Sequence, residues 1–162
     1  LQKDRILTNC FGRSVRFLGA WGDNLWKSAY SMLPQSTVVD SLNMGMQNLY
    51  DDKEVSGVTG ANADILAQVH DSILMQIPIS FLKVRENFEW FREKIRDETS
   101  PEMCYNGRTF KIASDFKFGM NWGEYGEKNP RGMQEFEDYD TFMKALETWE
   151  NVNVEGTLGL AH

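Results

Sequence analysis

The stretch at residues 68–78, QVHDSILMQIP, most narrows the structures that this 162-residue chain can adopt. Two apolar runs of strand length, residues 65–69 and 73–77, meet there at a polar pair. With no glycine or proline between them, they predict a tight hairpin with His70 and Asp71 at its tip. A tip held by two paired strands is a rigid mount for a metal ligand. A polar pair between strands is, on its own, more often a solvated turn.

A second hairpin is predicted at residues 5–19, where Gly12 separates two short apolar runs. Its arginines form the densest positive charge in the chain: Arg5, Arg13 and Arg16. Two interpretations remain open for them, a solvated face and contact with phosphate.

A long helix is predicted between residues 25 and 50, broken at Pro34 because proline lacks an amide hydrogen and clashes with the preceding turn. The break would leave the side chains of Ser31 and Gln35 free to point at a partner. The Asp- and Gly-rich residues 51–62 predict a surface loop that leads into the central hairpin.

The clearest helix signal follows Pro78, with Ser80 as its expected cap. Apolar residues recur there at helical spacing and indicate core packing: Phe81, Val84, Phe88, Phe91 and Ile95. Residues 109–118 predict a strand, residues 138–149 a short amphipathic helix, and the last dozen residues a frayed end. Hairpins with helices packed on one face predict an α+β domain with an antiparallel sheet.

The composition limits the class of protein. Hydrophobic residues make up 41% of the chain, which is typical of a globular protein. A net charge of −7 argues against nucleic-acid binding through bulk basic charge, although it permits a local basic patch or an acidic site that recruits Mg²⁺. No apolar run approaches the ~20 residues of a membrane span, and no signal peptide is evident. We therefore expect a cytoplasmic protein with reduced thiols at Cys10 and Cys104.

The residues favour carboxylate-bound magnesium over other catalytic chemistry. Only two histidines occur, His70 and His162, so a zinc site built on histidine is improbable. The glycine-rich phosphate motifs and the GxSxG motif are absent. Two-metal phosphoryl transfer needs at least two carboxylates around ions about 3.5–4 Å apart. Asp64 is too far along the strand to join Asp71, so a second carboxylate is expected from outside this motif set.

Four segments together resemble the family A DNA polymerases, the bacterial polymerase I type that includes many bacteriophage enzymes. The helix segment AYSMLPQSTVVDSL resembles the family's P-x-QGT-A-A-D motif, and QVHDSILMQIP resembles the hairpin that carries motif C, HD(E). The segment ILTNCFGRSVRFL is similar to the upstream GR hairpin, and ASDFKFGMNWGE to the closing strand with its G-x-x-W ending. The segments stand in the family's order and cover about residues 5–124.

The resemblance implies that residues 1–124 are the C-terminal part of the polymerase palm and that residues 125–162 are an extension carrying the short amphipathic helix. Asp71 would match the motif C aspartate, which binds two catalytic Mg²⁺ ions together with a carboxylate outside this chain. His70 would match the histidine near the primer terminus. The remaining matches concern primer–template DNA: Gln35 in the minor groove, Lys27 and Ser31 on the same helix, and Arg13 on the phosphate backbone. By its charge, and not by the resemblance, Arg16 is expected to join Arg5, Arg13 and Lys27 in a local basic track for nucleic acid.

Three departures from the family pattern bear on function. Ser72 replaces the usual glutamate of HDE, and the resulting HDS triplet is similar to single-subunit phage RNA polymerases. Ser36 replaces the glycine of QGT, and Pro34 lies one residue closer to Gln35. The first catalytic aspartate and the fingers helix that binds the incoming dNTP are missing from the sequence. The start at Leu1, which lacks an initiator Met, indicates a fragment or a processed piece.

These departures predict a chain that polymerises DNA only with a partner chain or fragment that supplies the fingers and the first aspartate. Two alternatives remain open. One is a non-catalytic module, derived from a polymerase, that binds nucleic acid or a protein. The other is part of a phage-type RNA polymerase.

Overall fold

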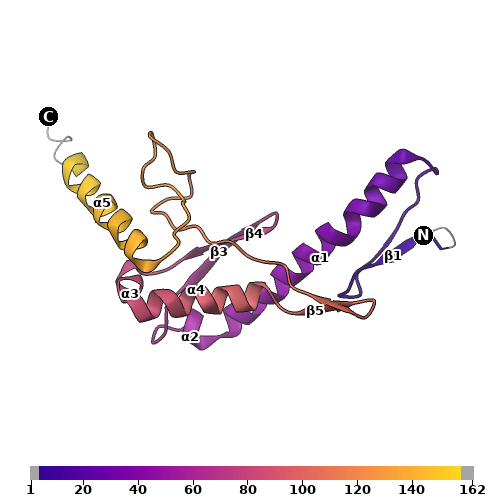
Figure 1. Cartoon of the computed structure of the whole chain (residues 1–162), viewed down its shortest axis with the longest axis horizontal. Coiled ribbons are helices and arrows are strands. Elements are labelled where there is room, and N and C mark those ends of the chain that lie inside the picture. Colours follow the sequence, from indigo (N-terminus) through magenta and orange to yellow (C-terminus); the bar gives the residue numbers. More distant parts are fainter. Residues whose placement is uncertain (1–3, 158–162) are drawn as a thin grey trace. The chain divides into compact units, whose positions relative to one another are not determined.

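The structure, a computed structural model, describes residues 4–157 and forms two compact units. The first unit comprises Leu1–Pro78 and Glu93–Ser114, and the second comprises Ile79–Arg92 and Asp115–His162. The elements in chain order are β1 (Ile6–Thr8), β2 (Ser14–Arg16), α1 (Asp23–Asp51), α2 (Lys53–Ser56), β3 (Asp64–Val69), β4 (Ser72–Gln76), α3 (Ile79–Leu82), α4 (Arg85–Thr99), β5 (Met103–Tyr105), β6 (Arg108–Phe110) and α5 (Tyr139–Thr157) (Figure 1).

The strands form three antiparallel hairpins, β1–β2, β3–β4 and β5–β6. The expected mixed α+β class and the two expected hairpins are thus confirmed. A continuous sheet was also expected, but among residues 4–157 each hairpin remains a separate two-stranded ladder. The hairpin β5–β6 was not predicted. Its turn is Asn106-Gly107, with φ of 50° and 73°, and this dipeptide favours two-residue hairpin turns because both positions need positive φ.

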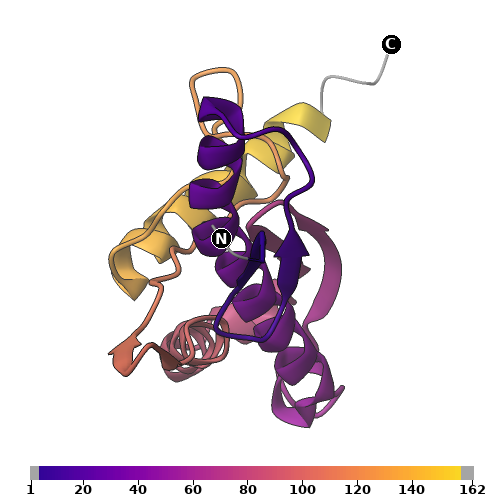
Figure 2. The same cartoon turned by 90° about the vertical axis from the view of Figure 1, so that its right-hand side faces the viewer.

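The hairpin β1–β2 packs along the N-terminal half of α1, as both views show (Figures 1 and 2). Phe17 of the hairpin segment is buried against Leu25 and Ala29 of α1. Leu7 and Val15 face each other across the ladder and add half-buried apolar surface to this cluster. The alternation of the strands therefore turns one face of the hairpin onto the helix and leaves the other face to solvent.

The helix α1 is continuous from Asp23 to Asp51, so the expected break at Pro34 is wrong. Proline removes only the hydrogen bond to the carbonyl of Tyr30 and crowds that carbonyl. Tyr30 is exposed (77%), so water can reach this turn, and the residues on both sides continue the helical ladder. The cost of the proline is therefore local and does not end the helix.

The C-terminal half of α1 packs closely on the last turns of α4. A Cβ on Gly45 would lie only 2.4 Å from the carbonyl oxygen of Glu98, so glycine is needed for this approach of two helices. Lys94 makes ion pairs with Asp52 (2.7 Å) and Glu98 (3.3 Å) beside this crossing. The expected loop at residues 51–62 begins instead with the short helix α2, because Asp52 caps it and buries Val55 beneath it.

The second unit is built on an aromatic cluster. Phe88 of α4 stacks on Phe142 of α5 with ring centroids 4.8 Å apart, and both side chains are fully buried. Trp149 joins them from α5 and donates its indole N–H to the carbonyl of Pro130 (2.8 Å). The residues after 124 thus supply much of the unit's core. The boundary expected from the family at residues 124 and 125 stays a prediction.

The helix expected after Pro78 is real but divided, because α3 ends at Leu82 and α4 begins at Arg85. Val84 is 46% exposed and lies at the division, whereas Phe88, Phe91 and Ile95 are buried as expected. Two side chains satisfy carbonyls near the division: Asn87 donates to Phe81 (3.2 Å) and the Tyr139 hydroxyl donates to Lys83. These bonds replace the helical hydrogen bonds that the division removes.

The strand expected at residues 109–118 is mostly absent. Only Arg108–Phe110 pairs, as β6, and residues 111–117 join no strand. Phe118 then forms an isolated bridge with Gln134, which closes the loop at residues 119–133. A Cβ on Gly119 would lie 2.8 Å from the backbone of Gly132, so this loop closes where two backbones approach.

The expected C-terminal helix is confirmed and is longer than the sequence indicated. α5 runs from Tyr139 to Thr157, so it includes part of the end that was expected to fray. Asp138 caps it by accepting a hydrogen bond from the amide of Thr141 (2.8 Å), which lowers the pKa of its carboxyl. His162 lies outside the described residues. Within residues 4–157, no helix is long and apolar enough to cross a membrane.

Candidate functional site

His70 and Asp71 form the two-residue turn of the hairpin β3–β4, closed by the pair Val69 and Ser72. Both turn residues are exposed, as the sequence predicts for a hairpin tip. His70 has a φ of 54°, in the left-handed region that histidine adopts more readily than β-branched residues. The strands β3 and β4 both contact α1, which supports the hairpin. The tip is thus an exposed carboxylate on a supported turn.

Ser72, which stands where the family has glutamate, has a role within the turn. Its hydroxyl donates a hydrogen bond to the carbonyl of Val69 (2.8 Å) and so closes the tip on itself. A hydroxyl used in this way supplies no negative charge to a metal. Asp71 is therefore the one carboxylate at the tip of this hairpin.

The described residues do not complete a metal site around Asp71. Across residues 4–157, no group of three or more His, Cys, Asp or Glu side chains is placed to hold an ion. A Mg²⁺ ion takes six oxygen ligands and usually keeps several waters, so a single carboxylate is a partial ligand set. The tip fits a shared metal site only if another chain or segment supplies further carboxylates.

Three predicted nucleic-acid contacts come together on one row of α1. Lys27, Ser31 and Gln35 are spaced four residues apart, so their side chains line one side of the helix. Lys27 and Gln35 are exposed, and the half-buried Ser31 donates its hydroxyl proton to the carbonyl of Ser28 (3.2 Å). The expected helix break was thus unnecessary: the continuous helix itself aligns these side chains.

The turn of the β1–β2 hairpin is fastened to α1 by Asn9, which is 4% exposed. Its amide group donates to the hydroxyl of Ser36 (3.1 Å) and to the carboxylate of Asp40 (2.7 Å). Its side-chain oxygen accepts the backbone N–H groups of Phe11 and Arg13, each at 3.0 Å. One buried amide therefore shapes the turn and docks it on the helix.

Arg13 and Asp40 form a two-pronged ion pair between the same turn and helix. The Nε atom of Arg13 lies 3.0 and 2.9 Å from the two carboxylate oxygens, and one terminal nitrogen lies 2.5 Å from Oδ1. The hydrogen bonds from Arg13 hold the pKa of the Asp40 carboxyl below its usual value, and those bonds raise the pKa of Arg13. Arg13 was predicted to contact phosphate, but its guanidinium is already engaged.

Arg16 lies on the other face of the same hairpin, paired with Ile6 across the ladder. Its side chain is exposed, and no carboxylate within residues 4–157 forms an ion pair with it. Arg16 therefore keeps an uncompensated positive charge. Of the two arginines predicted to contact phosphate, it is the one whose charge is available.

The structure thus groups some predicted residues and separates others. Lys27, Ser31 and Gln35 share a row, whereas no hydrogen bond or ion pair of the described residues connects this row with His70 or Asp71. The two residues that hold the β1–β2 turn on α1, Asn9 and Asp40, were not predicted from the sequence. Their signals were present: Asn9 stands before a glycine-containing turn, where its side chain can bond the backbone, and Asp40 ends the PQSTVVD motif.

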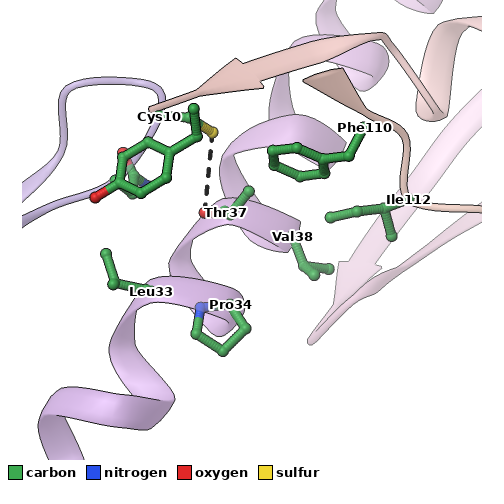
Figure 3. A pocket seen from close by; sticks show the side chains of 9 residues that line it. Cys10, Leu33, Pro34, Thr37, Val38, Phe110 and Ile112 are labelled. Carbon is green, nitrogen blue, oxygen red and sulfur yellow. Dashed lines mark hydrogen bonds between the residues drawn. The ribbon is translucent and has the colours of Figure 1, made fainter. Parts of the chain in front are cut away.

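An open pocket of about 240 Å³ lies beside this fastening (Figure 3). Its walls are apolar and include Leu33, Pro34 and Val38 of α1 together with Phe110 and Ile112. At one side the Cys10 thiol lies 4.0 Å from the Thr37 hydroxyl. The pocket is smaller than the roughly 300–1,000 Å³ typical of small-molecule sites, and neither residue of the 70–71 tip lines it.

Comparison of the chain with protein-family models, with curated proteins and with solved structures found no match. The likeness to family A polymerases therefore depends on the four sequence segments described above.

Proposed function

We propose that the chain is the C-terminal palm part of a family A DNA polymerase of the bacteriophage kind, active only with a chain or segment that supplies the rest. The observation that carries the proposal is the row of Lys27, Ser31 and Gln35 on α1. The resemblance matches Lys27 and Gln35 to residues that contact nucleic acid and Ser31 to a position that often holds Asn, and the helix aligns all three in one row. Asp71 at an exposed hairpin tip supports the same proposal.

In this proposal the chain holds the primer–template and contributes to the metal site. Gln35 contacts the minor-groove edge, while Lys27 and Arg16 contact phosphates, which position DNA without reading its sequence. His70 lies at the primer terminus, and Asp71 ligates Mg²⁺ together with an aspartate from outside the chain. Bound Mg²⁺ would lower the pKa of the primer 3′-hydroxyl and stabilise the departing pyrophosphate of the dNTP.

The missing parts define the partner. By the resemblance it would carry the first catalytic aspartate and the fingers helix that binds the incoming dNTP. Among the described residues, no group of three or more His, Cys, Asp or Glu side chains is placed to hold an ion, so a shared site would need carboxylates from that partner. The assembled enzyme would act in DNA replication in the cytoplasm of a bacterium or of a phage-infected host.

A primer-extension assay tests the proposal. The chain is assayed alone and then together with a candidate partner chain that carries the fingers and the first catalytic aspartate, each with Mg²⁺ and either dNTPs or rNTPs. Extension with dNTPs only in the combined sample supports the proposal. Extension with rNTPs alone would favour the RNA polymerase that the HDS triplet resembles.

A non-catalytic binding module is the second candidate. The observation that favours it is the bond from Ser72 to the carbonyl of Val69, which leaves Asp71 as the tip's single carboxylate. Binding to primer–template DNA without extension in any combination would support this module and contradict the polymerase.

A further inference from the structure

The fastened hairpin determines which side of α1 stays open. Met32, Ser36 and Asp40 are spaced four residues apart and form a row that contacts the hairpin through apolar packing, Asn9 and Arg13. The predicted nucleic-acid contacts, Lys27, Ser31 and Gln35, each come one position before residues 28, 32 and 36. Successive helical residues are rotated by about 100°. The docked hairpin therefore covers one row and leaves its neighbour, with Gln35, uncovered.

The Arg13–Asp40 pair is suited to hold this arrangement and poorly suited to bind phosphate. Both carboxylate oxygens are used by Arg13, and the carboxylate side chain is only 10% exposed. The charges of the pair cancel, so the pair would release few counterions on meeting DNA. Arg16 offers the contrast, since it is exposed and has no acidic partner among the described residues.

We infer that Arg13 is a positioning residue that acts through Asp40 and, with Asn9, keeps the hairpin on α1 so that Lys27, Ser31 and Gln35 face primer–template DNA. This inference rests on the proposed function and gives Arg13 a different role from the phosphate contact that the resemblance implies. Arg16, not Arg13, supplies the hairpin's phosphate contact.

The test measures the affinity of the whole chain for a duplex DNA with a recessed 3′ end, by fluorescence anisotropy across a series of NaCl concentrations. The key variant is Asp40→Asn, which removes an acidic charge and the carboxylate that holds Arg13. Positioning predicts that Asp40→Asn weakens binding about 3- to 10-fold, with an unchanged dependence of log Kd on log[salt]. Arg16→Gln, the matched control, should reduce that dependence by about 0.9, the value for one lost phosphate contact.

A phosphate role for Arg13 predicts the opposite sign for Asp40→Asn. Freeing the guanidinium and removing a negative charge would tighten binding and increase the salt dependence, and that result would overturn the inference. Asp40→Glu keeps the carboxylate that accepts from both Arg13 and Asn9, so it should recover affinity relative to Asp40→Asn. Failure of this rescue in a variant with the wild-type circular dichroism spectrum would also overturn it.

The same titration separates this inference from the proposed function. Absence of binding by the wild-type chain in low salt would contradict the DNA contacts of the proposed function and the positioning role together. Wild-type binding with a tighter Asp40→Asn variant would contradict the positioning role alone.

Discussion

Replacing Asn9 by alanine tests how the hairpin is held on α1. The buried amide makes four hydrogen bonds: its oxygen accepts two backbone N–H groups of the turn, and its nitrogen donates to Ser36 and Asp40. Alanine removes all four bonds and leaves the turn amides and the Asp40 carboxylate to find other partners. We expect the hairpin to open locally from the helix in this variant.

The magnitude follows from the kinds of bond that are lost. A neutral hydrogen bond contributes about 0.5–1.5 kcal/mol net, and one to a charged group about 1.5–3 kcal/mol. Because water can reach the turn when the hairpin opens, the four terms do not add fully. We expect the free energy of opening to fall by roughly 2–4 kcal/mol, which corresponds to about 30- to 1,000-fold faster exchange under conditions where the hairpin recloses faster than its amides exchange.

Hydrogen–deuterium exchange measured by mass spectrometry is the suitable assay, because two compact units can unfold separately and a single melting curve would mix them. Peptides that cover residues 5–18 should exchange faster in Asn9→Ala, while peptides of the second unit should not change. Asn24→Ala is the matched control, since Asn24 is exposed in the first turn of α1. A change below about 0.5 kcal/mol in the hairpin would refute the role assigned to Asn9.

Three further predictions follow from the packing and the charges. Gly45→Ala should destabilise the first unit by about 1–3 kcal/mol, measured by hydrogen exchange of that unit's peptides, because the added methyl meets the Glu98 carbonyl at 2.4 Å; a gain in stability from helix propensity would contradict this. The hydrogen bond from Lys94 lowers the pKa of Asp52, so the pair stabilises fully above the ordinary aspartate pKa of about 3.9 and loses this contribution as pH falls through the lower folded-state pKa; unfolding of Asp52→Asn should therefore depend less on pH in acid. Trp149→Phe should cost about 1 kcal/mol, measured by hydrogen exchange of peptides in the second unit, since it keeps an aromatic side chain but loses the bond to a loop carbonyl.

The sequence predicted those parts of the fold whose signals are local and periodic. The alternating apolar runs around Gly12 and around His70–Asp71 form hairpins, and the buried positions of α4 follow the helical spacing. It mispredicted Pro34 because the rule for proline concerns one hydrogen bond, whereas a 29-residue helix has many others. It mispredicted residues 111–117 because alternation shows an extended backbone but does not supply a strand to pair with.

The candidate site was predicted residue by residue, but its organisation was not. Identities and spacing placed Lys27, Ser31 and Gln35 on a helix, and helical geometry then aligned them. The partner of Arg13 could not be found in this way, because Asp40 lies 27 residues away in sequence and meets it only after the hairpin has docked. Long-range charge pairs depend on packing, so the sequence suggested a free cation where the structure has an ion pair.

The most direct test of the proposed polymerase is primer extension with and without the Asp71 carboxylate. The chain is expressed together with a candidate partner chain that carries the fingers and the first catalytic aspartate. Extension by dNTPs in Mg²⁺ and DNA affinity are then both measured. Asp71→Ala should abolish nucleotide addition while binding of primer–template changes less than about threefold, because Asp71 is exposed at the tip and supports no described part of the fold. Full extension by the Asp71→Ala enzyme would contradict the account.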